Sequence, residues 1–185
     1  IVARIGTDEL AIAHVLVNLA LFLILPGVGL GMAATTLVSH SLGRQEPEQA
    51  YRWGWDVVRV AVLVLFVLGM PFWLAPHLIL GLFTQDPALI DLGEWPLRIT
   101  GLGMSLDATA LVLTQALLGA GASRTVMAVN LGSQWLLFLP CAYIAGPLLG
   151  GGLLLVWLLQ SLYRCINSMI FALMWRRRHW ADIRI

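Results

Sequence analysis

The segment GLGMSLDATALVLTQALLGAG, residues 101–121, decides the fold class, because it is an apolar run long enough to cross a bilayer. Asp107 lies inside this run. An ionised carboxylate within a membrane is costly, and it usually faces the interior of a helix bundle or a wet cavity. The segment therefore predicts a membrane helix that carries an acid for a structural or a functional reason.

A helical wheel places Thr100, Asp107 and Thr114 on one face, because they are spaced seven residues apart. This face consists of small and polar side chains and differs from the leucine-rich remainder of the helix. Two interpretations follow from the spacing. The carboxylate either belongs to an ion or substrate path, or it forms a buried salt bridge or hydrogen bond that only fixes helix packing.

The composition of the whole chain agrees with a membrane protein. Of its 185 residues, 59% are hydrophobic and only 11% are charged, whereas a soluble domain has about 25% charged residues. The net charge of +1 gives no indication of a nucleic-acid partner, and none is expected. The lipid bilayer is the expected environment.

Five stretches are long and apolar enough to span a bilayer, which predicts an all-α integral membrane fold. The first contains Pro26-Gly27, at which we expect the helix to break. The predicted spans cover approximately residues 9–40, 55–82, 95–118, 124–146 and 150–175, and an arginine-rich tail follows at 176–185.

The arginines predict the orientation. Alternate connections at 43–53 and 119–124, together with the tail, hold seven of the eleven basic residues, whereas the opposite side holds only Arg4. Under the positive-inside rule the tail is cytoplasmic, in a multi-pass protein of the plasma or inner membrane. Five tryptophans near the ends of the spans are expected to be anchors at the membrane interface: Trp53, Trp55, Trp95, Trp175 and Trp180.

The fifth span has a polar face centred on Arg164, with Gln160 and Ser161 before it and Asn167 and Ser168 after it. Three arrangements of Arg164 are open. It pairs with Asp107, it pairs with a carboxylate on a segment outside this chain, or its side chain extends towards the interface.

Two further spans have polar faces, which carry Asn130, Ser133 and Gln134 on the fourth and His14 and Asn18 on the first. Each group can serve as an interhelical hydrogen bond or as a substrate contact. Four polar faces together predict a cavity inside the bundle. Its expected lining residues are Thr100, Thr114, Asn130, Gln134, Gln160, Arg164, Asn18 and His14.

Motifs for catalysis and for nucleotide binding are absent from the sequence. It has no HExxH, no GxSxG and no GxxxxGK[ST]. The sequence therefore predicts neither an enzyme nor a bound cofactor. A carrier driven by an ion gradient needs a titratable or cation-binding group in the membrane, and Asp107 is such a group.

Four blocks resemble, in order, the C-terminal half of the multidrug and toxic compound extrusion (MATE) family. His40 stands where the family usually has glutamine, and Leu118 stands where arginine is common. The blocks are PGVGLGMAATTLVSHSLG at 26–43, FTQDPALIDLGEWPLRI at 83–99, DATALVLTQALLGAGASRTVMAVNL at 107–131 and WLLFLPCAYIAGPLLGGGLLLVWLLQ at 135–160.

This resemblance implies that residues 1–185 form most of a six-helix C-terminal lobe, helices eight to twelve, with helix seven and the N-terminal lobe outside the chain. Members of the family export cationic and amphipathic drug-like compounds in exchange for Na⁺ or H⁺. Asp107 precedes Gly119 by twelve residues, which matches a cation-site aspartate of some members. Asp107 is thus the implied coupling residue, and Na⁺ there is the only metal ion expected.

A different class of function remains open. The chain is alternatively a non-transporting, membrane-structural protein, or the non-functional remnant of a transporter gene. An uninterrupted upstream reading frame that encodes the missing spans would favour the transporter.

Overall fold

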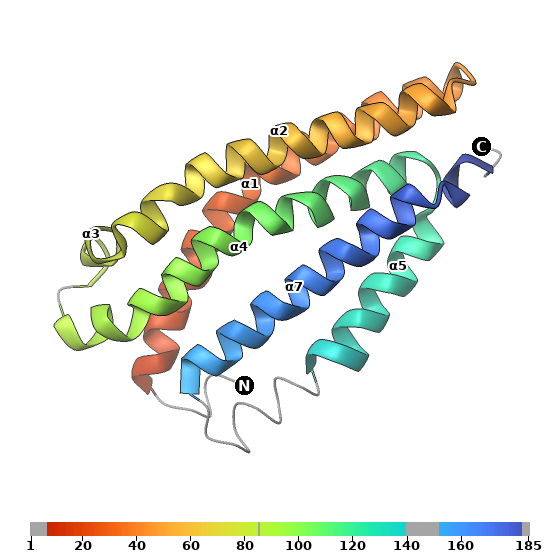
Figure 1. Ribbon diagram of the computed structural model, residues 1–185. Coiled ribbons are helices and arrows are strands. Elements are labelled where there is room, and N and C mark those ends of the chain that lie inside the picture. Colours follow the sequence, from red (N-terminus) through yellow and green to blue (C-terminus); the bar gives the residue numbers. More distant parts are fainter. Residues whose placement is uncertain (1–6, 85, 140–151, 183–185) are drawn as a thin grey trace.

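The computed structural model describes residues 7–84, 86–139 and 152–182, and within these ranges it consists of helices joined by short turns, with no strand. This confirms the predicted all-α fold, which is drawn in Figure 1. The longest elements are α1 (Thr7–Gly43), α2 (Pro47–Leu74), α4 (Pro87–Gly119) and α7 (Gly152–Arg176). The shorter ones are α3 (Pro76–Gly81), α5 (Ser123–Gly132), the π-helical η2 (Ser133–Phe138) and the 3₁₀ turn η4 (His179–Asp182).

Three helices among the described residues are long and apolar enough to cross a membrane: Leu10–Gly43, Pro47–Leu74 and Pro87–Gly119. They correspond to the first three predicted spans. The 25 residues of α7 coincide with the fifth. The fourth predicted span begins in α5 and η2, and its remainder from 140 onwards lies outside the described residues.

The first helix does not break at Pro26-Gly27, so that prediction is wrong. Residues Thr7–Gly43 form one helix with Pro26 inside it. Proline removes a single backbone hydrogen bond, and neighbouring helices can compensate for that loss in a membrane bundle. Gly27 is buried, and a Cβ placed there would lie 3.1 Å from a methyl carbon of Leu65 on α2. Packing across this position therefore supports a continuous helix.

The limits of two other helices differ from the predicted spans. α2 begins at Pro47 and ends at Leu74, and the short α3 follows from Pro76. Proline disfavours helical geometry in the preceding residue, which accounts for the interruption at Ala75. α4 begins at Pro87, where the side chain of Asp86 accepts a hydrogen bond of 3.0 Å from the backbone N–H of Ala88. The segment 87–94 is therefore the first part of a helix.

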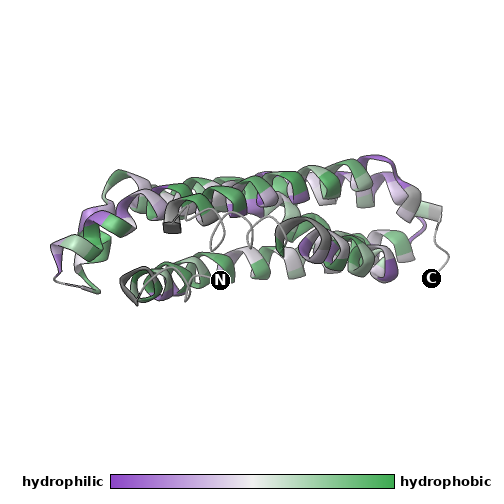
Figure 2. Cartoon of the chain, turned by 90° about the horizontal axis from the view of Figure 1, so that it is seen from below, coloured by the Kyte–Doolittle hydropathy of each residue, from purple (hydrophilic) through white to green (hydrophobic). Residues whose placement is uncertain are grey.

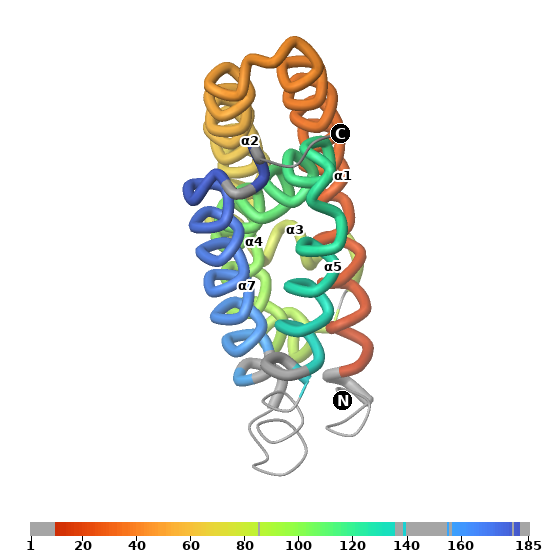
Figure 3. The backbone as a smooth tube through the Cα atoms, turned by 90° about the vertical axis from the view of Figure 1, so that its right-hand side faces the viewer, coloured from red at the N-terminus to blue at the C-terminus, as the bar shows by residue number. Residues whose placement is uncertain are grey.

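α4 is the central helix of the bundle. It packs against α1, α2 and α7, and Figure 1 shows it between α2 and α7. Figure 3 shows α5 and α7 running along one side of the same bundle. α4 and α2 approach closely at two glycines, where a Cβ on Gly69 would lie 2.6 Å from the carbonyl oxygen of Gly101. Only glycine allows these two backbones to lie so close together.

The outer surface is apolar along the helices. Large side chains such as Phe22, Leu25, Leu63 and Leu78 are more than half exposed. Figure 2 shows hydrophobic residues along the length of the bundle and hydrophilic residues gathered largely towards its two ends. Such a surface is suited to contact with lipid or with other apolar helices.

The end of the bundle that holds the α1–α2 and α4–α5 connections also holds the end of α7 (Figure 1). There Trp175 is fully buried and stacks on Trp180, with 4.2 Å between the ring centroids, and in parallel with Tyr51 of α2. Arg178 pairs with Glu48 and lies over the Tyr51 ring. The prediction that Trp175 and Trp180 are interfacial anchors is therefore wrong, because both side chains are buried in this aromatic stack.

Candidate functional site

An ion pair between α4 and α7 forms the centre of the candidate site. A guanidinium nitrogen of Arg164 donates a hydrogen bond to a carboxylate oxygen of Asp107. The side chains are only 21% and 14% exposed, respectively. Of the three arrangements open for Arg164, the structure shows the pairing with Asp107. Each charge thereby compensates the other in a poorly solvated position.

Two further contacts between α7 and α4 hold Arg164 and Asp107 next to each other. Arg164 also approaches the sulfur of Met104, one turn before Asp107, at 3.9 Å. The hydroxyl of the buried Ser168 donates a 2.6 Å hydrogen bond to the carbonyl oxygen of Leu106. Because Leu106 adjoins Asp107 and Ser168 lies one turn after Arg164, this bond fixes the two helices beside the ion pair.

A cavity of about 130 Å³ lies beside the pair, between α1, α4 and α7. Liquid water occupies about 30 Å³ per molecule, so the cavity has room for a few waters or a small polar group. Among the described residues, Arg164 is the only charged one in its wall. The other lining residues are Leu16, Val17, Ala20, Leu21 and Ile24 of α1, Ile99, Thr100 and Gly103 of α4, and Trp157, Gln160 and Ser161 of α7.

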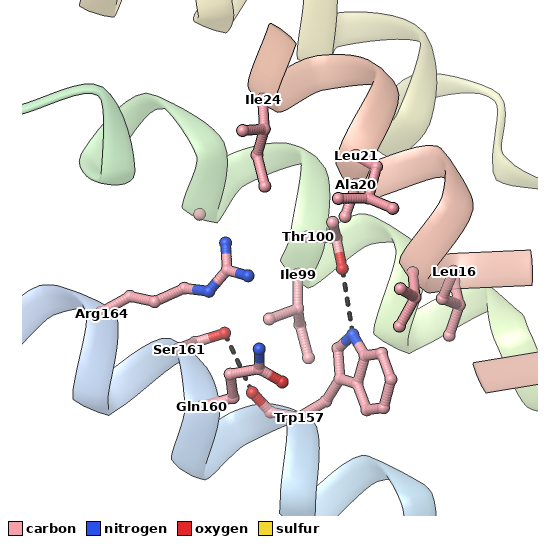
Figure 4. A pocket seen from close by; sticks show the side chains of 12 residues that line it. Leu16, Ala20, Leu21, Ile24, Ile99, Thr100, Trp157, Gln160, Ser161 and Arg164 are labelled. Carbon is pink, nitrogen blue, oxygen red and sulfur yellow. Dashed lines mark hydrogen bonds between the residues drawn. The ribbon is translucent and has the colours of Figure 1, made fainter. Parts of the chain in front are cut away.

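The polar groups at one side of the cavity are joined by hydrogen bonds, which Figure 4 shows in part. The indole N–H of Trp157 donates to the hydroxyl oxygen of Thr100 at 3.1 Å, and that hydroxyl donates to the carbonyl oxygen of Pro96 at 2.8 Å. Ser161 donates to the carbonyl oxygen of Trp157 at 3.0 Å. Thr100 is thus a fixed contact between α4 and α7, and Trp157 closes that side of the cavity.

The structure brings some of the predicted cavity residues together. Thr100, Gln160 and Arg164 line the cavity, and Asp107 adjoins it through its pairing with Arg164. Thr114 lies two turns further along α4, is partly buried and does not line the cavity.

The other predicted residues lie elsewhere. His14 and Asn18 are exposed on α1 and hydrogen-bond to each other at 3.0 Å. Asn130 of α5 is partly buried and Gln134 of η2 is exposed, and neither lines the cavity. η2 contacts α7 through Ser133, whose hydroxyl lies 3.5 Å from the side-chain oxygen of Asn167.

Sequence reasoning missed the apolar wall that α1 provides. Leu16, Ala20 and Ile24 recur every four residues and so share one helical face. The same spacing occurs all around an apolar membrane helix, so it gives no signal for the face that lines a cavity. Trp157 was missed as well, because its role depends on the hydroxyl of Thr100, 57 residues away.

The side chains near the ion pair offer oxygen atoms as possible ligands. No group of three or more His, Cys, Asp or Glu side chains that could hold a metal ion occurs in the part of the chain that the structure describes. The groups present near the pair are a carboxylate, hydroxyls and an amide. Oxygen ligands of this kind suit hard cations better than soft transition metals.

Comparison with known proteins gives a consistent set of matches. The family model described as MatE matches residues 1–144. A probable multidrug resistance protein NorM from Thermotoga maritima is 26% identical over 94% of this chain and 38% of its own length. The corresponding protein of a Synechococcus strain is 29% identical over 92% of the chain and 38% of its own length. An uncharacterized transporter, YisQ, from Bacillus subtilis is 22% identical over 97% of the chain and 39% of its own length. The chain therefore spans less than two fifths of the length of these relatives.

Proposed function

Because this chain belongs to the MatE family, we propose that it forms part of a cation-coupled antiporter that exports cationic and amphipathic drug-like compounds. Na⁺ or H⁺ moves inward in exchange, and neither a cofactor nor an enzymatic step takes part. The names of the relatives, a probable multidrug resistance protein and an uncharacterized transporter, support export as the activity. Since the chain covers less than two fifths of their length, transport is proposed for the complete gene product.

The observation that carries this proposal is the position of Asp107. Its carboxylate lies inside a helix bundle with an apolar outer surface, on the central helix and beside a cavity. The Asp107 side chain is only 14% exposed, so its pairing with Arg164 is not a solvated surface salt bridge. Ionisable groups in such positions commonly mark ion or substrate paths.

Ion coupling follows from the charge of this carboxylate. A proton or Na⁺ on Asp107 neutralises it and stabilises one arrangement of the helices, and a bound drug stabilises the other. Moving one charge through 100 mV supplies about 2.3 kcal/mol, which biases such an equilibrium without ATP. Alternating access then consists of rocking of the two lobes around the site.

The proposed location is the plasma or inner membrane, with the C-terminus in the cytoplasm. Arg44 follows α1, Arg52 and Arg124 lie near the starts of α2 and α5, and Arg176 ends α7. These helix ends lie at one end of the bundle, which supports this orientation under the positive-inside rule. The bilayer is the proposed partner surface, together with the lobe that lies outside this chain.

The test is efflux from proteoliposomes that contain the complete gene product. The vesicles are loaded with a fluorescent lipophilic cation, and a Na⁺ or pH gradient is imposed. Efflux that requires one of the gradients, and no nucleotide, is the expected result. Efflux that is equal with and without both gradients would refute the antiporter, and it would favour a membrane-structural protein instead.

A further inference from the structure

We propose that Arg164 is a tethered cation that competes with the coupling ion for Asp107, and that its guanidinium moves into the adjacent cavity when an ion takes the carboxylate. This inference rests on the proposed function, since it assigns a role in the coupling cycle to a residue on a different helix. Arg164 is a positioning residue in this scheme, because it acts through Asp107.

The side chain of Arg164 has two sets of neighbours, and this geometry points to the proposed role. Its side chain forms the ion pair with Asp107 and also belongs to the cavity wall. It reaches both from α7, whereas Asp107 belongs to α4. A short rotation of one side chain therefore exchanges the carboxylate for the cavity, and neither helix has to unwind.

The cavity offers a polar destination for the guanidinium. Figure 4 shows the guanidinium of Arg164 and the amide of Gln160 directed into the same space. The amide oxygen of Gln160 accepts hydrogen bonds, and so does the hydroxyl oxygen of Ser161, which already donates to Trp157. A volume of about 130 Å³ also admits water, which satisfies the remaining N–H groups.

The charges explain why such a competitor is useful. Without any cation, the carboxylate of Asp107 would remain ionised and poorly solvated after the coupling ion leaves, which opposes release. Arg164 supplies the positive charge at that moment, so that the site is neutral again. Since the described residues of the cavity wall include no carboxylate, the displaced guanidinium has no second ion pair among them and returns to Asp107.

Competition by Arg164 determines the direction in which the affinity of Asp107 for the coupling ion changes when Arg164 is replaced. Removing the positive charge of Arg164 removes the competitor, and the coupling ion then binds Asp107 more tightly. A residue that only held the helices together would produce the opposite result, because its loss would loosen the carboxylate and weaken ion binding.

The experiment measures the half-saturating concentration of the driving cation for efflux in proteoliposomes with the complete gene product. The probe is Na⁺ at fixed pH, or H⁺ in the absence of Na⁺. Arg164→Gln is expected to lower this concentration at least tenfold, and to slow turnover because ion release is slower. Arg164→Lys keeps the charge and is expected to stay within threefold of the parent. Arg98→Gln is the control, because Arg98 lies on α4 but pairs with Glu94 at 2.7 Å, away from the cavity.

A second variant tests the destination without changing the ion pair. Gln160→Leu removes the amide that receives the guanidinium, and it is expected to raise the half-saturating concentration several-fold. This variant decides the question if Arg164→Gln fails to reach the membrane. An unchanged value in Gln160→Leu, or an unchanged or raised value in Arg164→Gln, would overturn the competition.

The outcome for Asp107→Asn separates this inference from the proposed function. If Asp107→Asn abolishes ion dependence while Arg164→Gln does not tighten ion binding, only the competition is wrong. If Asp107→Asn leaves ion dependence intact, the proposed coupling role itself is wrong.

Discussion

Asp107 and Arg164 lie 57 residues apart in the sequence, and their side chains form an ion pair between α4 and α7. The pair connects the central helix to the helix that closes one side of the cavity. The pair is partly buried, so removing one partner leaves the other charge uncompensated in a poorly solvated position, which is destabilising. The pair is thus a structural contact as well as the proposed site of ion coupling.

A charge swap tests the contact itself. Asp107→Arg and Arg164→Asp are each expected to lower the thermal unfolding midpoint of the protein in detergent, because each places two like charges together. The double variant restores opposite charges and is expected to recover at least half of the loss. If the double variant is no more stable than either single variant, the two side chains are not in contact.

The close approach of α2 and α4 at Gly69 and Gly101 gives a prediction about packing. In Gly69→Ala the new Cβ lies 2.6 Å from the carbonyl oxygen of Gly101, and the helices have to separate. We expect a loss of about 1–3 kcal/mol, which is typical of overpacking. Gly29→Ala is the matched control, because a Cβ at this helical glycine meets nothing within 4 Å. Equal thermal midpoints for the two variants would mean that this close approach is not present.

The aromatic stack at the end of α7 gives a further prediction. Trp175 is fully buried between Tyr51 and Trp180, and its replacement by alanine is expected to cost about 3–5 kcal/mol. Trp135, which is 67% exposed, serves as the control and is expected to cost much less. Limited proteolysis also measures the effect, since the segment after α7 becomes easier to cleave when the stack is lost. An unchanged cleavage rate in Trp175→Ala would contradict the stack.

The hydrogen bond between Trp157 and Thr100 can be isolated by a double-mutant cycle. Thr100→Val leaves the buried indole N–H without its acceptor, which costs about 1–3 kcal/mol. Trp157→Phe removes the donor as well, so the two changes together are expected to cost less than the sum of the single changes. Strictly additive losses of stability would show that the indole and the hydroxyl do not interact.

Much of the fold follows from composition and from the few charges in apolar segments. The apolar runs gave the all-α membrane fold and the order of the long helices, because a bilayer leaves few alternatives. The limits of the helices were harder to place. Pro26 did not break α1, and Pro87 began α4 earlier than polarity suggested, since tertiary packing and an N-cap decide those positions.

The sequence predicted only those residues of the site that are polar groups within apolar helices. Asp107, Arg164, Thr100 and Gln160 were recognisable as polar groups within apolar helices, and the structure places them in or beside one cavity. The apolar lining from α1 gave no such signal. His14 was predicted to line the cavity because it lies on a polar face, but its side chain hydrogen-bonds to Asn18 of the same helix. Periodicity shows which residues share a face but does not show which helix that face meets.

The most direct test of the account is the effect of Asp107→Asn on gradient-driven efflux by the complete gene product in proteoliposomes. The side-chain amide nearly preserves the shape but cannot carry the charge. We predict that efflux loses its dependence on the imposed Na⁺ or H⁺ gradient, while Ser105→Ala on the same helix, whose hydroxyl bonds only to the Leu102 carbonyl oxygen, retains it. Unchanged gradient dependence in a folded Asp107→Asn protein would contradict the central claim and leave Asp107 as a structural partner of Arg164.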